Sequence, residues 1–200
     1  MANDLIQQNP WDELRAHTSA RIALGRVGCS LPTREVLKFG LAHAQARDAV
    51  HRPLDFNELK HQLHAAGFRT LKVRSNAEDR QTYLLRPDHG RHLHGDCQVQ
   101  LQHELPAPEI AIVLADGLSA VAVQRHALPL LQALRDRFDT DWANTPVVLA
   151  EQGRVAIGDG IGEALRARLV IVMIGERPGL TSPDSLGLYL TCLLYTSPSP

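Results

Sequence analysis

The chain has 200 residues and a formal net charge of −1 at pH 7, so its overall charge offers no attraction to nucleic acid or to an acidic membrane surface. Hydrophobic residues make up 44% of the sequence, which suffices for one or two domains with a packed core. No apolar run approaches the length of a membrane helix, and the N-terminus has neither a basic start nor an apolar signal segment. These features predict a cytoplasmic protein with no nucleic-acid or membrane partner.

The first 105 residues mostly follow the period of helices. One helical face is expected to carry Trp11 and Leu14 in a helix that ends near Gly25, and a second helix over 32–50 should have Leu37 and Leu41 on its apolar side. A third helix follows Asp55, which is spaced as an N-cap, and a fourth runs from about residue 93. Between them, a strand containing Leu71 and Val73 is expected to pair with residues 83–85 as a small hairpin.

Two prolines, Pro106 and Pro108, interrupt this pattern and mark the boundary that we expect between two regions. Beyond them, continuous apolar runs are typical of strands that are buried on both faces, and helical segments separate these runs. The apolar runs are residues 110–115, 146–149 and 169–174. The fold class is therefore predicted as α/β: a mostly helical region over 1–105, then a Rossmann-like parallel β-α-β-α-β domain over 106–191 with right-handed crossovers.

A glycine-containing loop follows each of the three expected strands. Because ligands of open α/β sheets bind outside the carboxyl ends of the strands, we expect these loops to form a ligand crevice. The first loop is not the Gly-x-Gly-x-x-Gly turn, so the usual pyrophosphate-binding fingerprint is absent. The loops are Asp116-Gly117-Leu118-Ser119, Gly153-Arg154-Val155 and Gly175-Glu176-Arg177-Pro178-Gly179.

Potential metal ligands follow one another just before and inside the fourth helix: His89, His92, His94, Asp96 and Cys97. His92 and His94 are two residues apart and would point in different directions on a helix, so we expect no metal site there. The three cysteines are far apart in the sequence and odd in number, so we expect no disulfide framework.

Several short motifs, in this order and at this spacing, resemble the light (small) subunit of ethanolamine ammonia-lyase, an adenosylcobalamin-dependent enzyme. The resemblance extends over nearly all of residues 9–191. The motifs are Thr18-x-Ala-Arg-Ile-x-x-Gly-Arg-x-Gly28, Tyr83-Leu-x-Arg-Pro-Asp-x-Gly-Arg91, Asp116-Gly-Leu-Ser119, Gly153-Arg-Val155, Asp159-x-Ile-Gly-Glu163 and Gly175-Glu-Arg-Pro-Gly-Leu180.

The resemblance implies a hetero-oligomeric lyase in which cobalamin lies between a large and a small subunit. The large subunit would hold ethanolamine and convert it to acetaldehyde and ammonia, so no catalytic residue and no metal ligand is expected in this chain. The small subunit would supply part of the cobalamin pocket. By motif, Val155 and Glu176 match cobalamin-contacting positions of the family. The remaining cofactor-binding candidates come from the same loops: Asp116, Gly117, Ser119, Gly175 and Arg177.

The resemblance ends after Thr191, and residues 192–200 are interpreted as a non-family tail of a truncated or frameshifted reading frame. Cys192 does not match the position of the family's cobalamin-contacting cysteine. The resemblance also implies a place in ethanolamine catabolism, in the cytoplasm or inside a bacterial microcompartment. The alternative function is a stand-alone, non-catalytic α/β module that binds a nucleotide-like ligand, and a purely structural partner protein is a third.

Overall fold

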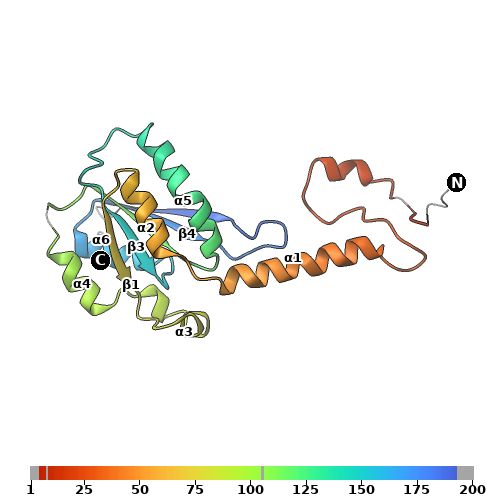
Figure 1. Cartoon of the computed structure of the whole chain (residues 1–200), viewed down its shortest axis with the longest axis horizontal. Helices are drawn as coiled ribbons and strands as arrows, with labels where there is room; N and C mark the ends of the chain where they lie inside the picture. The colour runs from red at the N-terminus through yellow and green to blue at the C-terminus, as the bar shows by residue number, and fades with distance from the viewer. Residues whose placement is uncertain (1–4, 8, 105, 193–200) are drawn as a thin grey trace, which may run out of the picture.

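A computed structural model describes residues 5–7, 9–104 and 106–192. The chain forms a mixed α/β body from which a long helix, α1 (Thr33–His51), projects as an arm toward the N-terminal segment (Figure 1). Within the described residues, the body contains a five-stranded sheet in the order β1-β3-β2-β4-β5. The strands are β1 (Thr70–Arg74), β2 (Ile110–Ala115), β3 (Val147–Glu151), β4 (Leu169–Gly175) and β5 (Leu186–Cys192).

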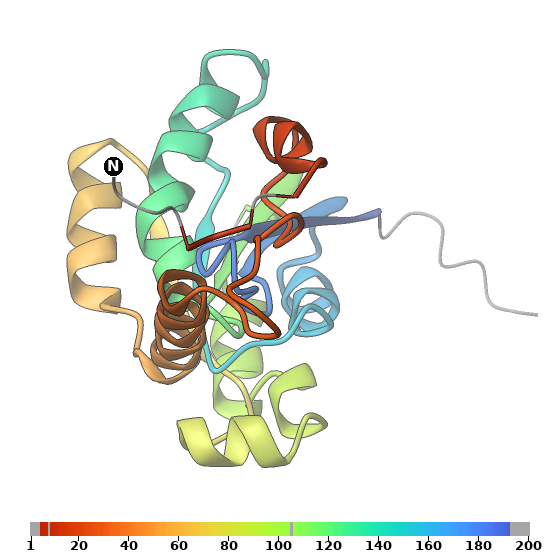
Figure 2. The same ribbon diagram turned by 90° about the vertical axis from the view of Figure 1, so that its right-hand side faces the viewer.

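The expected succession of three strands and two helices is confirmed as β2, α5 (Ala120–Arg135), β3, α6 (Ile157–Leu165) and β4. The strands are parallel, and β2 lies between β3 and β4. The chain therefore leaves β2 toward one side and later crosses it to reach the other side. With crossovers of one hand, these two connections place α5 and α6 on opposite faces of the sheet (Figure 2).

Both faces of the sheet carry a closed core, which explains why the sequences of β2, β3 and β4 lack polar alternation. On one face, side chains of β2 such as Val113 pack with Ile161 of α6. On the other face, Ile112 and Leu114 pack with Leu131 of α5. Two further helices complete the layers: α4 (Gly95–Gln102) packs with α6, and α2 (Phe56–Ala65) packs with α5. At the start of α2, the Asp55 carboxylate accepts a hydrogen bond from the Glu58 N–H at 2.9 Å, so the expected N-cap is confirmed.

The predicted hairpin is wrong. Residues 70–74 form β1, as expected, but this strand pairs in parallel with β3 instead of folding back on residues 83–85. Those residues belong to the short helix α3 (Arg80–Leu85), which is followed by the 3-10 helix η2 (His89–Arg91). The Asp79 carboxylate caps α3 by accepting from the Thr82 N–H at 2.7 Å. The sheet thus includes one strand that precedes residue 106 in the sequence.

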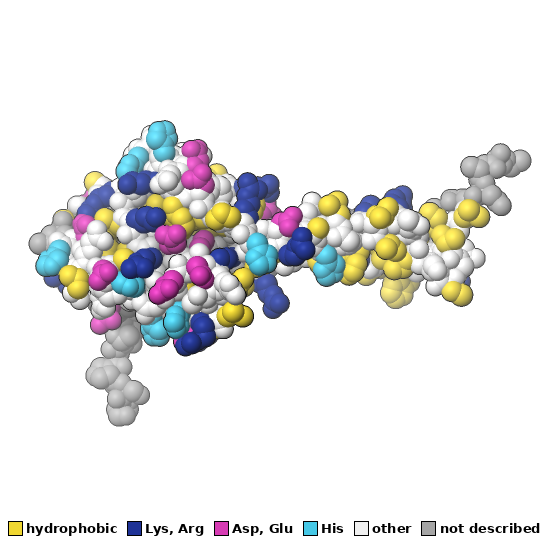
Figure 3. All heavy atoms as spheres, turned by 60° about the horizontal axis from the view of Figure 1, so that its bottom comes forward, with side chains coloured by type: hydrophobic (Ala, Val, Ile, Leu, Met, Phe, Trp, Pro, Cys, Tyr) yellow, Lys and Arg dark blue, Asp and Glu magenta, His cyan; other side chains and the backbone are white. Residues whose placement is uncertain are grey.

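The N-terminal arm leaves much of its apolar surface open. The prediction of a helix over residues 11–25 is wrong, since the short 3-10 helix η1 (Asp12–Ala16) forms there instead. Leu37 and Leu41, on the expected apolar side of α1, are 67% and 60% exposed. Hydrophobic side chains gather along this arm in the space-filling view (Figure 3). No helix in the described ranges combines the length and the apolarity that crossing a membrane requires.

Strand β5 forms an open edge of the sheet. It runs antiparallel to β4 along its whole length, from Leu186 opposite Gly175 to Cys192 opposite Leu169. Within the described residues its other side is unpaired. Leu188, Tyr189 and Leu190 expose large side chains there, and Leu190 is 67% exposed. Unpaired backbone groups beside apolar side chains favour pairing with another chain.

We therefore expect the isolated chain to self-associate through β5. A lysine in place of Leu190 should oppose this by adding charge to the edge strand, so Leu190→Lys should increase the monomer fraction in size-exclusion chromatography with light scattering. The matched control is Leu85→Lys, which changes a leucine of α3 that is 70% exposed and lies outside the sheet. Equal monomer fractions in the two variants would contradict an association through β5.

Candidate functional site

The three expected loops lie at one edge of the sheet, because β2, β3 and β4 are parallel and each loop follows a carboxyl end. The loops after β2 and β4 are adjacent. The chain leaves β2 toward one side, whereas β4 lies on the other side, so this is the topological switch point of the parallel strands. Ligands of open α/β sheets bind at such points.

Two candidate glycines, Gly117 and Gly175, allow the loops after β2 and β4 to pack closely against each other. The Leu118 N–H donates to the Gly175 carbonyl at 2.8 Å. A Cβ on Gly117, whose φ is +59°, would lie 2.3 Å from that same carbonyl oxygen. A Cβ on Gly175 would lie 2.0 Å from the Ser119 carbonyl oxygen. The space beside Gly175 is therefore filled by the neighbouring loop, and both glycines are required by backbone packing.

The carboxylate of Asp116 joins the loop after β2 to the loop after β3. Its Oδ1 accepts from the N–H groups of Gly117 at 3.0 Å and Gly153 at 3.1 Å, and its Oδ2 accepts from the Gln152 N–H at 3.2 Å. Asp116 is only 4% exposed. Burial raises the pKa of its carboxyl group to about 6, while Arg80 and the three backbone donors oppose this shift. Asp116 is thus a buried link between loops.

Arg80, which lies outside the family motifs, supports the link that Asp116 forms. Arg80 donates to the carbonyl oxygens of Val50 and Gly117, the latter at 2.8 Å, and its Nη1 lies 3.9 Å from Asp116. Its guanidinium lies 4.7 Å from the ring centre of Tyr83, and that of Arg154 lies 4.6 Å from it. Arg154 also donates to the Tyr83 carbonyl at 3.0 Å.

These contacts explain the motif that begins at Tyr83. The Tyr83 side chain is buried, and the missing side chain of Gly90 makes room for it, since a Cβ there would lie 3.1 Å from the ring. The Arg154 N–H donates to the Gly90 carbonyl at 2.8 Å. The segment from α3 to η2 therefore supports the loop that carries Val155. Only the motif spacing signalled its relevance in the sequence.

The candidate residues divide into buried and presented groups. Ser119 is fully buried, and its hydroxyl donates to the Pro183 carbonyl at 2.7 Å. Glu176 is partly exposed, and its Oε1 accepts a hydrogen bond from the Tyr189 hydroxyl at 2.6 Å. The buried group that holds the loops together is Asp116, Gly117, Ser119 and Gly175, and the group with exposed surface is Val155, Glu176 and Arg177.

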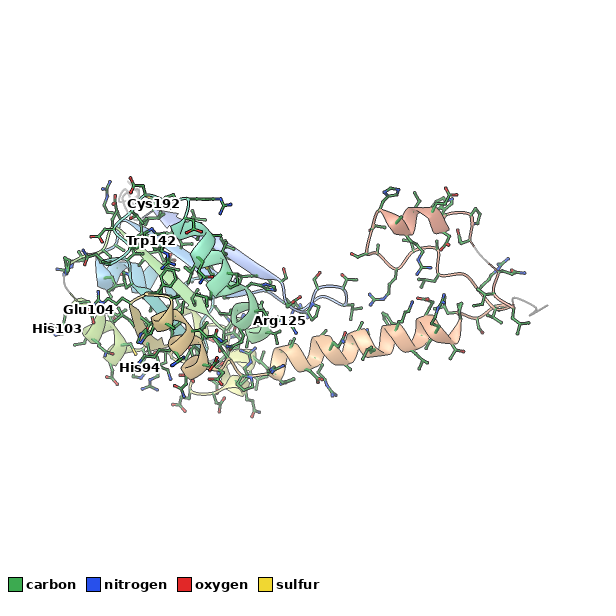
Figure 4. The ribbon with its side chains drawn as sticks, turned by 45° about the horizontal axis from the view of Figure 1, so that its top comes forward. His94, His103, Glu104, Arg125, Trp142 and Cys192 are labelled. Carbon is green, nitrogen blue, oxygen red and sulfur yellow. The ribbon has the colours of Figure 1, made fainter. Side chains whose placement is uncertain are left out.

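The loop between β4 and β5 is attached to its surroundings at both sides. Asp184 accepts from Arg125 of α5 at 3.0 Å, and this hydrogen bond lowers the pKa of the Asp184 carboxyl. Arg21, from the N-terminal segment, donates to the Leu180 carbonyl at 3.1 Å. Figure 4 shows Arg125 at the end of the body that faces the arm, whereas Cys192 lies at the opposite end of the sheet. Cys192 is therefore remote from the candidate site.

The candidate site is an open surface at the carboxyl ends of β2, β3 and β4. We call it the ledge, and its surface residues are Val155, Glu176 and Arg177. The cavity that Asp116 lines, together with His51, Arg80 and Gln152, has a volume of about 70 Å³. Ligand pockets usually exceed about 300 Å³, so a large ligand must lie on the outer side of the loops. A wider surface hollow of about 430 Å³ lies elsewhere, beside His89, His92 and His94. In the described part of the chain, no group of histidine, cysteine and acidic residues is arranged to hold a metal ion.

The packing of the two loops predicts a strong effect of one methyl group. Gly175→Ala places a Cβ against the Ser119 carbonyl and should lower the free energy of unfolding by about 3 kcal/mol, the upper range for overpacking. Gly40→Ala is the control, because nothing lies within 4 Å of a Cβ at this position of α1. It should be neutral or stabilise by up to about 1 kcal/mol through helix propensity. Urea unfolding measures both, and an equal stability of the two variants would count against the loop contact.

The buried carboxyl predicts a pH dependence. Its pKa is about 6 in the folded chain against an ordinary value of 3.8, so between these values the folded state binds a proton that the unfolded state releases. The free energy of unfolding should therefore fall as pH rises through this window, by at most about 1.4 kcal/mol per pH unit, and level off above it. Asp116→Asn cannot titrate and should show a flatter curve in urea unfolding. Parallel curves for the two proteins would rule out this assignment.

Comparison with known proteins agrees with the motifs. The family model described as ethanolamine ammonia-lyase light chain (EutC) matches residues 8–196, which extends past the point where we expected the resemblance to end. The chain is 55% identical over 189 residues to the ethanolamine ammonia-lyase small subunit of Azotobacter vinelandii, covering 92% of this chain and 70% of that protein. For the small subunit of Ralstonia nicotianae, the identity is 55% over 191 residues, covering 93% and 71%. The chain therefore belongs to the ethanolamine ammonia-lyase light chain family.

Proposed function

We propose that this chain is the small subunit of an adenosylcobalamin-dependent ethanolamine ammonia-lyase and that its ledge at the carboxyl ends of β2, β3 and β4 forms one wall of the cobalamin pocket. The observation that carries the proposal is the partly exposed Glu176 directly after β4, at the switch point, in a chain of this family. The order β3-β2-β4 with helices on both faces supports a Rossmann-like domain for this role.

The side chains on the ledge fit a corrinoid ligand chemically. The corrin ring bears amide side chains, which donate and accept hydrogen bonds, and methyl groups, which need apolar contact. The Glu176 carboxylate offers an acceptor, and Val155 offers a partly exposed apolar side chain that is anchored on the core. The small cavity beside Asp116 cannot enclose such a ligand, so this chain provides one wall and a partner must provide the other.

The four buried candidate residues act in this proposal as supports. Asp116 holds the loop that carries Val155, and Gly175 with Gly117 holds the start of the loop that carries Glu176. Groups that orient a ligand must be kept within a fraction of an ångström, which loops achieve only when their backbones are fixed. When bound, adenosylcobalamin supplies the radical chemistry, and this chain contributes binding and orientation.

The partner that we propose is the large subunit of the lyase. The relatives are named small subunits, and the arm of this chain exposes apolar side chains that a neighbouring subunit can cover. The exposed set on the arm and the segment before it is Leu5, Trp11, Leu14, Val27, Leu31, Val36, Leu37, Phe39 and Leu41. The large subunit would hold ethanolamine and release acetaldehyde and ammonia. A location inside a microcompartment stays a prediction.

No observation favours the stand-alone nucleotide-binding module. The cavity beside Asp116 holds about 70 Å³, which is well below the usual size of a ligand pocket. The larger hollow nearby, of about 310 Å³, lies between the start of α5 and the residues before α2, away from the loops that follow β3 and β4. The loops after β2 and β4 fill the space between them with their own backbone.

The test is a titration of the enzyme, assembled from this chain and its large subunit, with adenosylcobalamin. Removing the Glu176 acceptor should cost about 1.5–3 kcal/mol of binding free energy, so Glu176→Ala should weaken cofactor affinity roughly tenfold to over a hundredfold. Glu176→Gln keeps one acceptor and should lose less. At saturating cofactor, kcat for acetaldehyde release should return to near the unmodified value, because the reaction occurs on the large subunit.

The matched control is Glu109→Ala, which removes an exposed glutamate that precedes β2 at the opposite edge of the sheet. Its ion pair with Arg168 is exposed, so cofactor affinity should not change. The chain alone should bind adenosylcobalamin weakly, since it supplies one wall. A Glu176→Ala enzyme with unchanged affinity and a collapsed kcat would falsify the binding role.

A further inference from the structure

The Glu176 carboxylate lies over strand β5, in a position that Gly187 and Tyr189 define and that we call its seat. Gly187 and Tyr189 are two residues apart on this strand, so they share one face of the sheet. A Cβ on Gly187 would lie 2.1 Å from the Glu176 Oε1, which means that the carboxylate occupies the space of the missing side chain. The Tyr189 hydroxyl donates to the same oxygen at 2.6 Å, a distance typical of a hydrogen bond to an ionised acceptor.

This seat fixes the carboxylate in one orientation. The Glu176 N–H donates to the Ser185 carbonyl at 2.9 Å, so the backbone is held as well as the side chain. With Oε1 occupied, Oε2 accepts no hydrogen bond from any residue in the ranges 5–7, 9–104 and 106–192. A glutamate side chain that rotates freely loses conformational entropy when it binds a ligand. A side chain that is already held by a hydrogen bond lost this entropy on folding, so ligand binding costs less.

We infer that Tyr189 is a positioning residue: its hydroxyl holds one oxygen of Glu176 so that the other is presented to an amide N–H donor of the ligand. The inference rests on the proposed role of Glu176 in binding cobalamin, and it adds a residue and a mechanism that the motif comparison did not mark. Gly187 has the same positioning role, because any larger residue there would displace the Glu176 carboxylate.

The first test asks whether the pair forms, and it needs no cofactor. The hydrogen bond to Glu176 and the nearby negative charge raise the pKa of the Tyr189 hydroxyl above its ordinary value of 10.0. An ultraviolet titration of the full chain minus that of Tyr189→Phe isolates this hydroxyl. In a Glu176→Ala background, which removes both the hydrogen-bond acceptor and the charge, the same difference should give a lower pKa for the Tyr189 hydroxyl. An identical Tyr189 pKa in both backgrounds would overturn the inference.

The second test measures adenosylcobalamin binding by absorbance in the assembled lyase. Tyr189→Phe should weaken the Kd about threefold to tenfold, the range for one hydrogen bond, while kcat at saturating cofactor stays within about twofold. Gly187→Ala should weaken binding in the same direction. Tyr189→Phe combined with Glu176→Ala should be no weaker than Glu176→Ala alone, because both changes act through one carboxylate. Leu188→Ala, on the opposite face of β5, is the control and should leave the Kd unchanged.

The outcomes separate this inference from the proposed function. If Glu176→Ala weakens binding and Tyr189→Phe does not, the positioning role is overturned and the cobalamin-binding role stands. If Tyr189→Phe binds more tightly, the tyrosine competes with the ligand and the inference is again overturned. If neither variant changes the Kd, the proposed role of Glu176 itself is wrong. If Tyr189→Phe does not fold, the titration of Glu176→Ala against the unmodified chain still decides whether the pair exists.

Discussion

The candidate site depends on the buried carboxylate of Asp116. A buried charge is costly unless hydrogen bonds replace its water, and here three backbone N–H groups do so, while the Arg80 guanidinium lies 3.9 Å away as an ion-pair partner. The donors come from the loops after β2 and β3, while Arg80 extends the link to the carbonyl of Val50 at the end of α1. These segments cannot separate without leaving Asp116 unpaired in the core. A buried polar group of the switch point therefore also fixes its shape.

This arrangement separates support from contact. Asp116, Gly117, Ser119 and Gly175 pack the loops against one another, and they leave Val155, Glu176 and Arg177 at the surface. The same separation holds at the scale of the chain. The body has closed cores on both faces of the sheet, whereas the arm and strand β5 expose apolar side chains. A subunit that completes its binding site with a partner is expected to have surfaces of both kinds.

The position of Glu176 shows how a strand can control a loop residue. Glu176 follows β4, and its hydrogen-bond partner Tyr189 belongs to β5, which is antiparallel to β4. The register of that pair puts Gly187 and Tyr189 on the face over which the carboxylate lies. A shift of one residue would turn both to the other face, so the geometry of the site follows from strand pairing.

The sequence by itself determined strands β2 and β4, helix α5, the presence of a helix between β3 and β4, and the Asp55 cap, because these features depend on local apolar runs and local hydrogen bonds. It also placed three loops at one sheet edge, and its motifs identified the family. Residues 83–85 were wrongly expected to form a strand, because an apolar triplet does not show what packs on it. In the folded chain, Tyr83 is buried with Arg80 and Arg154 nearby in helix α3.

Only the tertiary structure decided which candidate residues support the site and which are presented on it. The missing side chain of Gly175 leaves room for the Ser119 backbone, and Glu176 accepts a hydrogen bond from Tyr189, which lies 13 residues later on the neighbouring strand β5. The physical reason is that periodicity reports which side of an element is buried, whereas contacts between loops depend on strand order and register, which are set by the packing of the whole sheet.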